Sequence, residues 1–109
     1  MIKGVKLSSQ IQKVEGGYHL VGEVDFATVP QIWKDSESIY ASSHNGSLVI
    51  DLSAVTRADS AGLALLVGWV RRGNAAGVTT VFKDIPEQLL AIARVSGVEN
   101  MLPTDQSAH

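Results

Sequence analysis

The chain contains no cysteine, no block of like charge and no long hydrophobic segment. Without cysteine it can form no disulfide and offers no thiolate for catalysis, which fits the cytoplasm. No basic run exceeds two residues and the formal net charge is -2, which argues against a nucleic-acid surface. The longest apolar run, Leu63–Val70, falls far short of the ~20 residues of a membrane-spanning helix. The N-terminus also lacks the apolar core of a signal peptide.

Hydrophobic residues make up 45% of the 109 residues, enough to build the core of one domain. We expect a single domain over residues 1–109, with a core of about 5–103 and a frayed tail over 104–109 that begins near Pro103. No internal repeat, linker or low-complexity tract divides it.

Alternating apolar residues predict strands and helical spacing predicts helices, in the order β-β-α-β-α-β-α. The expected strands are 5–14, 18–24, 47–52 and 78–82, and the expected helices are 25–42, 60–76 and 85–96. The segment 98–102 fits either a short strand or a turn. This order predicts an α/β fold in which helices pack against a mixed sheet of about four to five strands.

Local residue chemistry supports these boundaries. Gly16 and Gly17 suit a tight turn between the first two strands. Asp25 or Thr28 is a candidate cap for the first helix, with Pro30 in its first turn. The nearly continuous apolar run 47–52 predicts a central strand buried on both faces.

The helix 60–76 carries apolar residues on more than one side. A helical wheel predicts a core face formed by Leu63, Leu66, Val67 and Val70. It places Ala61, Leu65, Gly68 and Arg72 on a different face, with Trp69 between the two. Leu65 and Trp69 could form a docking surface for a partner, or another element of the same domain could cover them.

Ser60 stands where this helix begins and exposes its unpaired amides. Its hydroxyl could cap the helix together with Asp59, dock against a partner, or accept a phosphate that the helix dipole favours. The residues alone leave these alternatives open.

The sequence gives little support for catalysis. His19, His44 and His109 are not spaced like metal ligands, and no phosphate-binding glycine loop is present. Asp51 and Asp59 could form an acid–base pair, but capping and loop hydrogen bonds explain both more simply. Ser60 has no histidine partner nearby in the sequence. We therefore expect a protein that is not an enzyme and that binds neither metal nor cofactor.

Two motifs resemble the STAS domains, the family of anti-sigma factor antagonists. One is Asp51-Leu-Ser followed by Asp59-Ser60-Ala61-Gly62-Leu63, and the other is the loop Gly22-Glu23-Val24-Asp25. Their spacing and the order of the elements also agree, over residues 8–103. The resemblance implies the STAS fold, and Ser60 matches the hydroxyl that is phosphorylated in anti-sigma factor antagonists.

Within the family, the chain is most similar to the small STAS subunit of a phospholipid ABC transporter. Three stretches carry this similarity: Pro30-Gln-Ile-Trp33-Lys, Gly62–Leu66 and the ending Val98–Pro103. The resemblance implies a cytoplasmic accessory subunit that binds the transporter ATPase, and through it the inner-membrane permease, without entering the membrane. That transporter maintains the lipid asymmetry of the outer membrane.

The expected partner-binding and regulatory residues are Asp25, Trp33, Asp59, Ser60, Ala61, Leu65, Trp69 and Arg72. Trp33 equally fits ordinary core at the boundary of the first helix. The alternative function is an anti-sigma factor antagonist that a serine kinase switches at Ser60. A second copy of the chain could also pair through Leu65 and Trp69.

Overall fold

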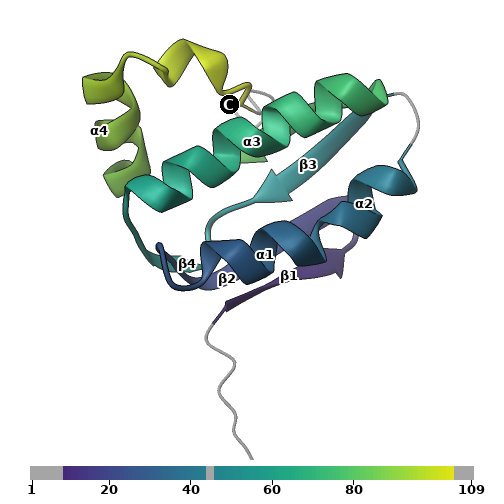
Figure 1. Cartoon of the computed structure of the whole chain (residues 1–109), viewed down its shortest axis with the longest axis horizontal. Helices are drawn as coiled ribbons and strands as arrows, with labels where there is room; N and C mark the ends of the chain where they lie inside the picture. Colours follow the sequence, from purple (N-terminus) through teal and green to yellow (C-terminus); the bar gives the residue numbers. More distant parts are fainter. Residues whose placement is uncertain (1–8, 44–45, 105–109) are drawn as a thin grey trace, which may run out of the picture.

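The structure is a computed structural model that describes residues 9–43 and 46–104. It contains both strands and helices, in a mixed order along the sequence (Figure 1). In chain order the elements are β1 (Ser9–Val14), β2 (Gly17–Val24), α1 (Val29–Asp35), α2 (Glu37–Ala41), β3 (Ser47–Asp51), β4 (Val55–Ala58), α3 (Ser60–Ala76), β5 (Thr79–Lys83), α4 (Glu87–Ser96) and the 3-10 helix η1 (Glu99–Met101).

The five described strands form one mixed sheet with the order β1-β2-β3-β5, and β4 also pairs with β2. β1 and β2 form an antiparallel hairpin, closed by a turn in which Gly16 takes a φ of 88° that glycine adopts without strain. β2 pairs in parallel with β3 through Tyr18 and His19, and then with β4 through Gly22–Val24. β3 and β5 are also parallel. The expected mixed sheet is therefore confirmed.

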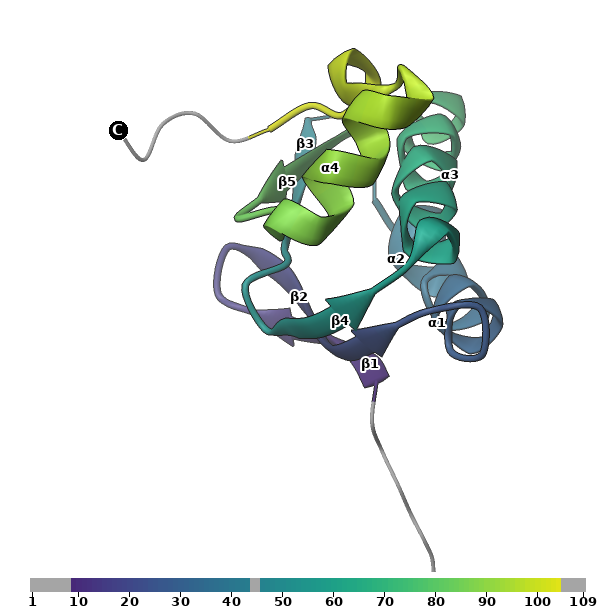
Figure 2. The ribbon, with the colours of Figure 1, turned by 90° about the vertical axis from the view of Figure 1, so that its left-hand side faces the viewer.

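The helices lie on one face of this sheet and enclose the core (Figures 1 and 2). Alternate strand residues such as Leu20, Ile50 and Phe82 are fully buried beneath α3 and α4. Tyr40 of α2 reaches the same core, where its hydroxyl lies 2.7 Å from Oγ1 of Thr80. Burial raises the pKa of Tyr40 to about 12, so its hydroxyl stays protonated.

The first predicted helix is two short helices rather than one. Residues 25–28 form a turn in which the Asp25 carboxylate accepts the amides of Ala27 and Thr28, and α1 begins only at Val29, with Pro30 in its first turn. Ser36 separates α1 from α2. Its buried hydroxyl donates to the carbonyl of Trp33 at 2.8 Å, and a serine that bonds back to the preceding turn competes with the regular helix pattern.

The sequence missed β4 and misjudged the end of the chain. β4 has four residues, of which Thr56 and Arg57 are exposed, so it lacks the apolar alternation of a longer strand. The segment 98–102 contains the 3-10 helix η1. Pro103 and Thr104 are not frayed, because the Pro103 carbonyl accepts the amide of Phe82 at 2.9 Å and Thr104 forms a bridge with Phe82.

The run 47–52 forms the inner strand β3, but only one of its faces is in the core. Leu48 and Ile50 are buried, whereas Val49 and Asp51 are half-buried on the opposite face. The expectation that both faces are buried was wrong, because the helices pack on one side only. Residues 5–8 and the expected turn at 44–45 lie outside the described residues, as does the tail 105–109.

Candidate functional site

Asp59, and not Ser60, caps helix α3. Its Oδ1 accepts the amide of Ala61 at 2.8 Å, and its extended backbone is typical of an N-cap. Ser60 is the first residue of the helix and is exposed. In the described part of the chain no side-chain hydrogen bond engages its hydroxyl. The hydroxyl is thus available to a partner or a phosphoryl group.

The loop between β2 and α1 lies directly beside this helix start. Asp25 is only 7% exposed, and its Oδ1 accepts the amides of Ala27 and Thr28 at 3.0 and 3.1 Å. Its Oδ2 pairs with a terminal nitrogen of Arg57 on β4 at 3.1 Å. Asp25 therefore shapes and anchors the loop rather than presenting its carboxylate to a partner.

Asp59 joins the two loops and leaves Phe26 facing outward. Its Oδ2 accepts the amide of Phe26 at 3.3 Å, so one carboxylate caps α3 and holds the neighbouring loop. The Phe26 side chain is 78% exposed, which is unusual for a large apolar residue held on a rigid turn. The sequence patterns do not select this residue. The available indication was an aromatic residue between two capping residues, Asp25 and Thr28.

Contributions of opposite sign act on the pKa of Asp25. Burial raises this pKa, but the amides of Ala27 and Thr28 and the guanidinium of Arg57 lower it by a larger amount, so the pKa lies below its ordinary value of 3.8.

A carboxyl whose pKa is lowered in the folded state stabilises the fold at pH values above its ordinary pKa, and this contribution is lost as the pH falls through the folded-state pKa. We expect Asp25→Asn to lower the free energy of unfolding at neutral pH, and the difference from wild type to shrink below pH 3.8. Urea unfolding between neutral pH and about pH 2 measures this; a difference that stayed constant would contradict it.

Leu65 and Trp69 do not face a partner, so this expectation was wrong. Leu65 is 2% exposed and Trp69 is fully buried. The wheel misplaced them because α1 and α2 pack along the side of α3 that seemed free, as the Nε1–H of Trp69 donating to the Ser36 hydroxyl at 2.8 Å shows. The alternative reading, that another element of the same domain covers them, is confirmed. Pairing of two copies through these residues is excluded for the same reason.

Trp33 and Arg72 form a stacked pair on the seam between α1 and α3. The Arg72 guanidinium carbon lies 3.4 Å from the centroid of the half-buried Trp33 ring, a cation–π geometry. Arg72 also donates to the Trp33 carbonyl and the Ser36 hydroxyl, both at 3.1 Å. Together with Gly68, Arg71 and Ala75 they line a shallow groove that opens to the surface. Trp33 therefore lies at the boundary of the core: its half-buried ring packs against Arg72 and Gly68 and also lines the groove.

The two carboxylates considered for catalysis, Asp51 and Asp59, both hold local hydrogen bonds. Among the described residues, no group of three or more histidine and carboxylate side chains is placed to hold a metal ion. The Asp51 carboxylate accepts the amide of Ser53, a loop hydrogen bond, as Asp59 accepts that of Ala61. His19 lies on β2, and His44 and His109 lie outside the described ranges. Among the helices of this part of the chain, none is long and apolar enough to cross a membrane.

The family model described as the MlaB STAS domain matches residues 7–103. The chain belongs to the STAS domain family. The match includes the helix start at Asp59 and Ser60 and the loop at Asp25, as the resemblance of the motifs predicted. A sequence comparison with curated proteins finds no relative of this STAS domain.

Solved structures confirm the STAS fold. A Thermotoga maritima protein assigned as an anti-sigma factor antagonist matches with a TM-score of 0.70 at 14% identity, over 90% of this chain and 87% of that chain. An anti-sigma factor antagonist from Mycobacterium paratuberculosis gives 0.64 at 25% identity, over 90% and 84%. The antagonist SpoIIAA in its unphosphorylated form gives 0.65 at 20% identity, over 92% and 90%.

Proposed function

We propose that this STAS domain is a non-enzymatic accessory subunit that binds and supports the ATPase of a phospholipid ABC transporter maintaining outer-membrane lipid asymmetry. Through the ATPase it would sit at the cytoplasmic side of the inner membrane, peripheral to the permease. The match of residues 7–103 to an MlaB-type model supports the transporter role. The observation that carries partner binding is the exposed Phe26 held beside the free hydroxyl of Ser60.

The proposed partner surface runs along the seam between α1 and α3. It begins at Phe26 and Ser60, includes the half-buried Ala61, and continues to the groove of Trp33 and Arg72. Trp33 packs over Gly68, which lies eight residues, or ~12 Å, beyond Ser60 along the helix. Exposed aromatic and arginine side chains around a few polar groups are typical of the residues that dominate binding energy at interfaces.

We expect purification of the tagged chain from native membranes in mild detergent to recover an ATPase and a permease. Phe26→Asp should reduce this recovery at least ~tenfold, because it removes an apolar contact and buries a charge in the interface. Ser60→Glu should also reduce it by charge and desolvation. The matched control is Val95→Asp, which changes an 89% exposed valine on α4 and should leave recovery unchanged. Mass spectrometry of the recovered proteins gives the readout.

Two outcomes would contradict the transporter role. In one, the wild-type chain recovers no ATPase under conditions that keep such complexes intact. In the other, Phe26→Asp and Val95→Asp reduce recovery equally, which would place the contact away from the α1–α3 seam. Circular dichroism of each variant separates a lost contact from a lost fold.

A second candidate function is an anti-sigma factor antagonist regulated by phosphorylation of Ser60. The observation that favours it is the exposed hydroxyl in the first turn of α3, where unpaired amides and the helix dipole stabilise an added anion. In the same purification, recovery of a soluble serine kinase that is lost with Ser60→Glu would favour this function. Incubation with that kinase and ATP should then add one phosphate to wild type and none to Ser60→Ala.

A further inference from the structure

One face of the sheet carries no helix in the described part of the chain (Figures 1 and 2). Three of its four strand pairs are parallel, namely β2–β3, β2–β4 and β3–β5. Parallel strands are usually covered on both faces, whereas here Val49 and Val81 on the outer face remain half-buried. This outer face has two rows of side chains that run across the strands.

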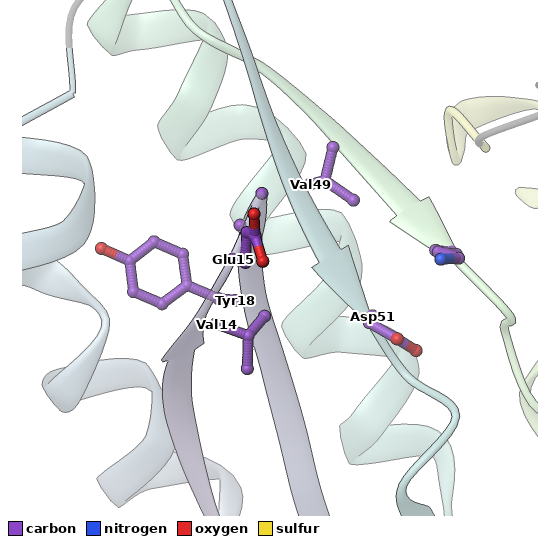
Figure 3. A pocket seen from close by; sticks show the side chains of 8 residues that line it. Val14, Glu15, Tyr18, Val49 and Asp51 are labelled. Atoms are coloured by element: carbon purple, nitrogen blue, oxygen red, sulfur yellow. The ribbon is translucent and has the colours of Figure 1, made fainter.

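The first row is apolar and contains a hollow. It consists of Val14 on β1, Gly17 on β2, Val49 on β3 and Val81 on β5, since Val14 pairs with Gly17 and Val49 with Val81. Gly17 approaches Val49 so closely that an added Cβ would lie 2.3 Å from the Val49 carbonyl oxygen. A hollow opens at this point and is lined by Val14, Gly17 and Val49 together with Glu15, Asp51 and Lys83. Figure 3 shows Val14, Glu15, Val49 and Asp51 around it.

The second row is polar and adjoins the first. Gln12, His19, Asp51 and Lys83 are paired in sequence across β1, β2, β3 and β5. A ring nitrogen of His19 lies 2.8 Å from the side-chain oxygen of Gln12. Burial raises the pKa of Asp51, but hydrogen bonds from Ser53 and, to a smaller extent, the neighbouring Lys83 and His19 lower it by more, so the pKa lies below its ordinary value.

We propose that a second copy of this chain packs on the outer face, with a two-fold axis that runs parallel to the strands between β2 and β3. This axis sets β1 against β5 of the second copy and β2 against its β3. Val49 of each copy then fills the hollow above Gly17 of the other. In the polar row, His19 of each copy faces Asp51 of the other, and Gln12 faces Lys83.

Complementarity selects a second copy as the occupant. The rows match each other under this one axis, in shape at Gly17 and Val49 and in polar side chains at His19 and Asp51, as an isologous interface requires. Sheets that pack face to face keep their strands within about 30° of each other, which suits an axis along the strands. The face supplies fewer residues than the roughly 20–30 a side of a standard interface, so the dimer is expected to be weak. It leaves Phe26 and Ser60 free, because they lie at the α1–α3 seam.

Sedimentation of the full chain over a wide concentration range tests the dimer. We expect the sedimentation coefficient of wild type to rise toward the dimer value with concentration. Val49→Lys, which places a charge opposite the hollow, should weaken the dimer at least ~tenfold. Val95→Lys adds the same charge at an exposed position on α4 and should leave it unchanged. A wild-type chain that stays monomeric up to about 1 mM, above the range of weak specific complexes, would overturn the proposal.

Cross-linking tests the axis, and the chain's lack of cysteine makes each introduced thiol unique. Gln12→Cys mixed with Lys83→Cys should be joined by a short bismaleimide, because these positions face each other across the proposed axis. Each variant alone should give little cross-linked product, since its two thiols then lie at opposite edges of the dimer. Equal or greater cross-linking of either variant with itself would overturn the arrangement.

Discussion

Replacement of Leu65 by aspartate is expected to unfold the protein rather than to release a partner. Leu65 is 2% exposed and belongs to the buried core of the domain. Truncating a buried leucine costs about 2–5 kcal/mol, and an unpaired buried carboxylate adds several more. The sum is comparable with the whole stability of a small domain, about 5–15 kcal/mol. Circular dichroism and urea unfolding measure the loss.

Phe26→Asp is the matched control, because it introduces the same charge at a residue that is 78% exposed. It should change the free energy of unfolding by less than about 0.5 kcal/mol, as surface substitutions usually do. If Leu65→Asp kept a cooperative fold close to wild type in stability, the position of Leu65 in the core would be wrong. The comparison also shows why loss of binding by a Leu65 variant would say nothing about where a partner docks.

The sequence predicted helix α3 well but assigned its faces poorly. Its start at Asp59 and Ser60 and its end at Gly77 were correct, because a carboxylate cap and a left-handed glycine with a φ of 78° are local features. Which side of the helix is buried depends on the elements that pack against it, and a local sequence pattern does not show which elements those are. The helix buries Leu63 and Leu66 as predicted, but also Leu65 and Trp69, since it packs against the sheet, α4 and the α1–α2 pair at once.

The candidate site shows the same division between local and long-range information. Ser60 and Asp59 were recognisable from their place before an apolar helix, and Asp25 from its place in a loop motif. The contact between Asp59 and the Phe26 amide joins residues 33 positions apart, so no local pattern could indicate that these two loops meet. The only local indication for Phe26 was its place between the candidate caps Asp25 and Thr28, and that place does not show that the side chain is exposed.

β4 was missed for a related reason. Four residues with two exposed polar side chains carry no clear alternation, and the strand exists because β2 extends beyond β3 and leaves backbone groups to be paired. The Ala58 amide is satisfied by the side-chain oxygen of Gln88 on α4 at 2.9 Å, again a distant residue. Short strands of this kind form because the backbone groups of a neighbouring strand need hydrogen-bond partners, and not because their residues have a high β propensity.

Replacement of Gly73 by alanine is expected to destabilise the protein, although alanine favours helices. In an exposed helix the change would add about 1 kcal/mol of stability. Here the new Cβ would lie 2.6 Å from Oγ1 of Thr80 and 2.7 Å from the carbonyl oxygen of Val78. Both atoms are fixed, since Thr80 bonds to Tyr40 and Val78 is held in the turn that leaves α3. Overpacking of this kind costs about 1–3 kcal/mol or more, so we expect a net loss of roughly 2 kcal/mol in urea unfolding.

Gly68→Ala is the control, because it makes the same change five residues earlier on the same helix. Its Cβ would lie 3.0 Å from the Trp33 ring, which belongs to a half-buried side chain at the surface and can move by a few tenths of an ångström. We therefore expect Gly68→Ala to leave stability within about 0.5 kcal/mol of wild type, because the gain in helix propensity offsets the contact. It should instead alter the stacking of Trp33 on Arg72, visible as a change in tryptophan fluorescence in a Trp69→Phe background. Equal losses of stability at Gly68 and Gly73 would contradict the distinction between a contact that can yield and one that cannot.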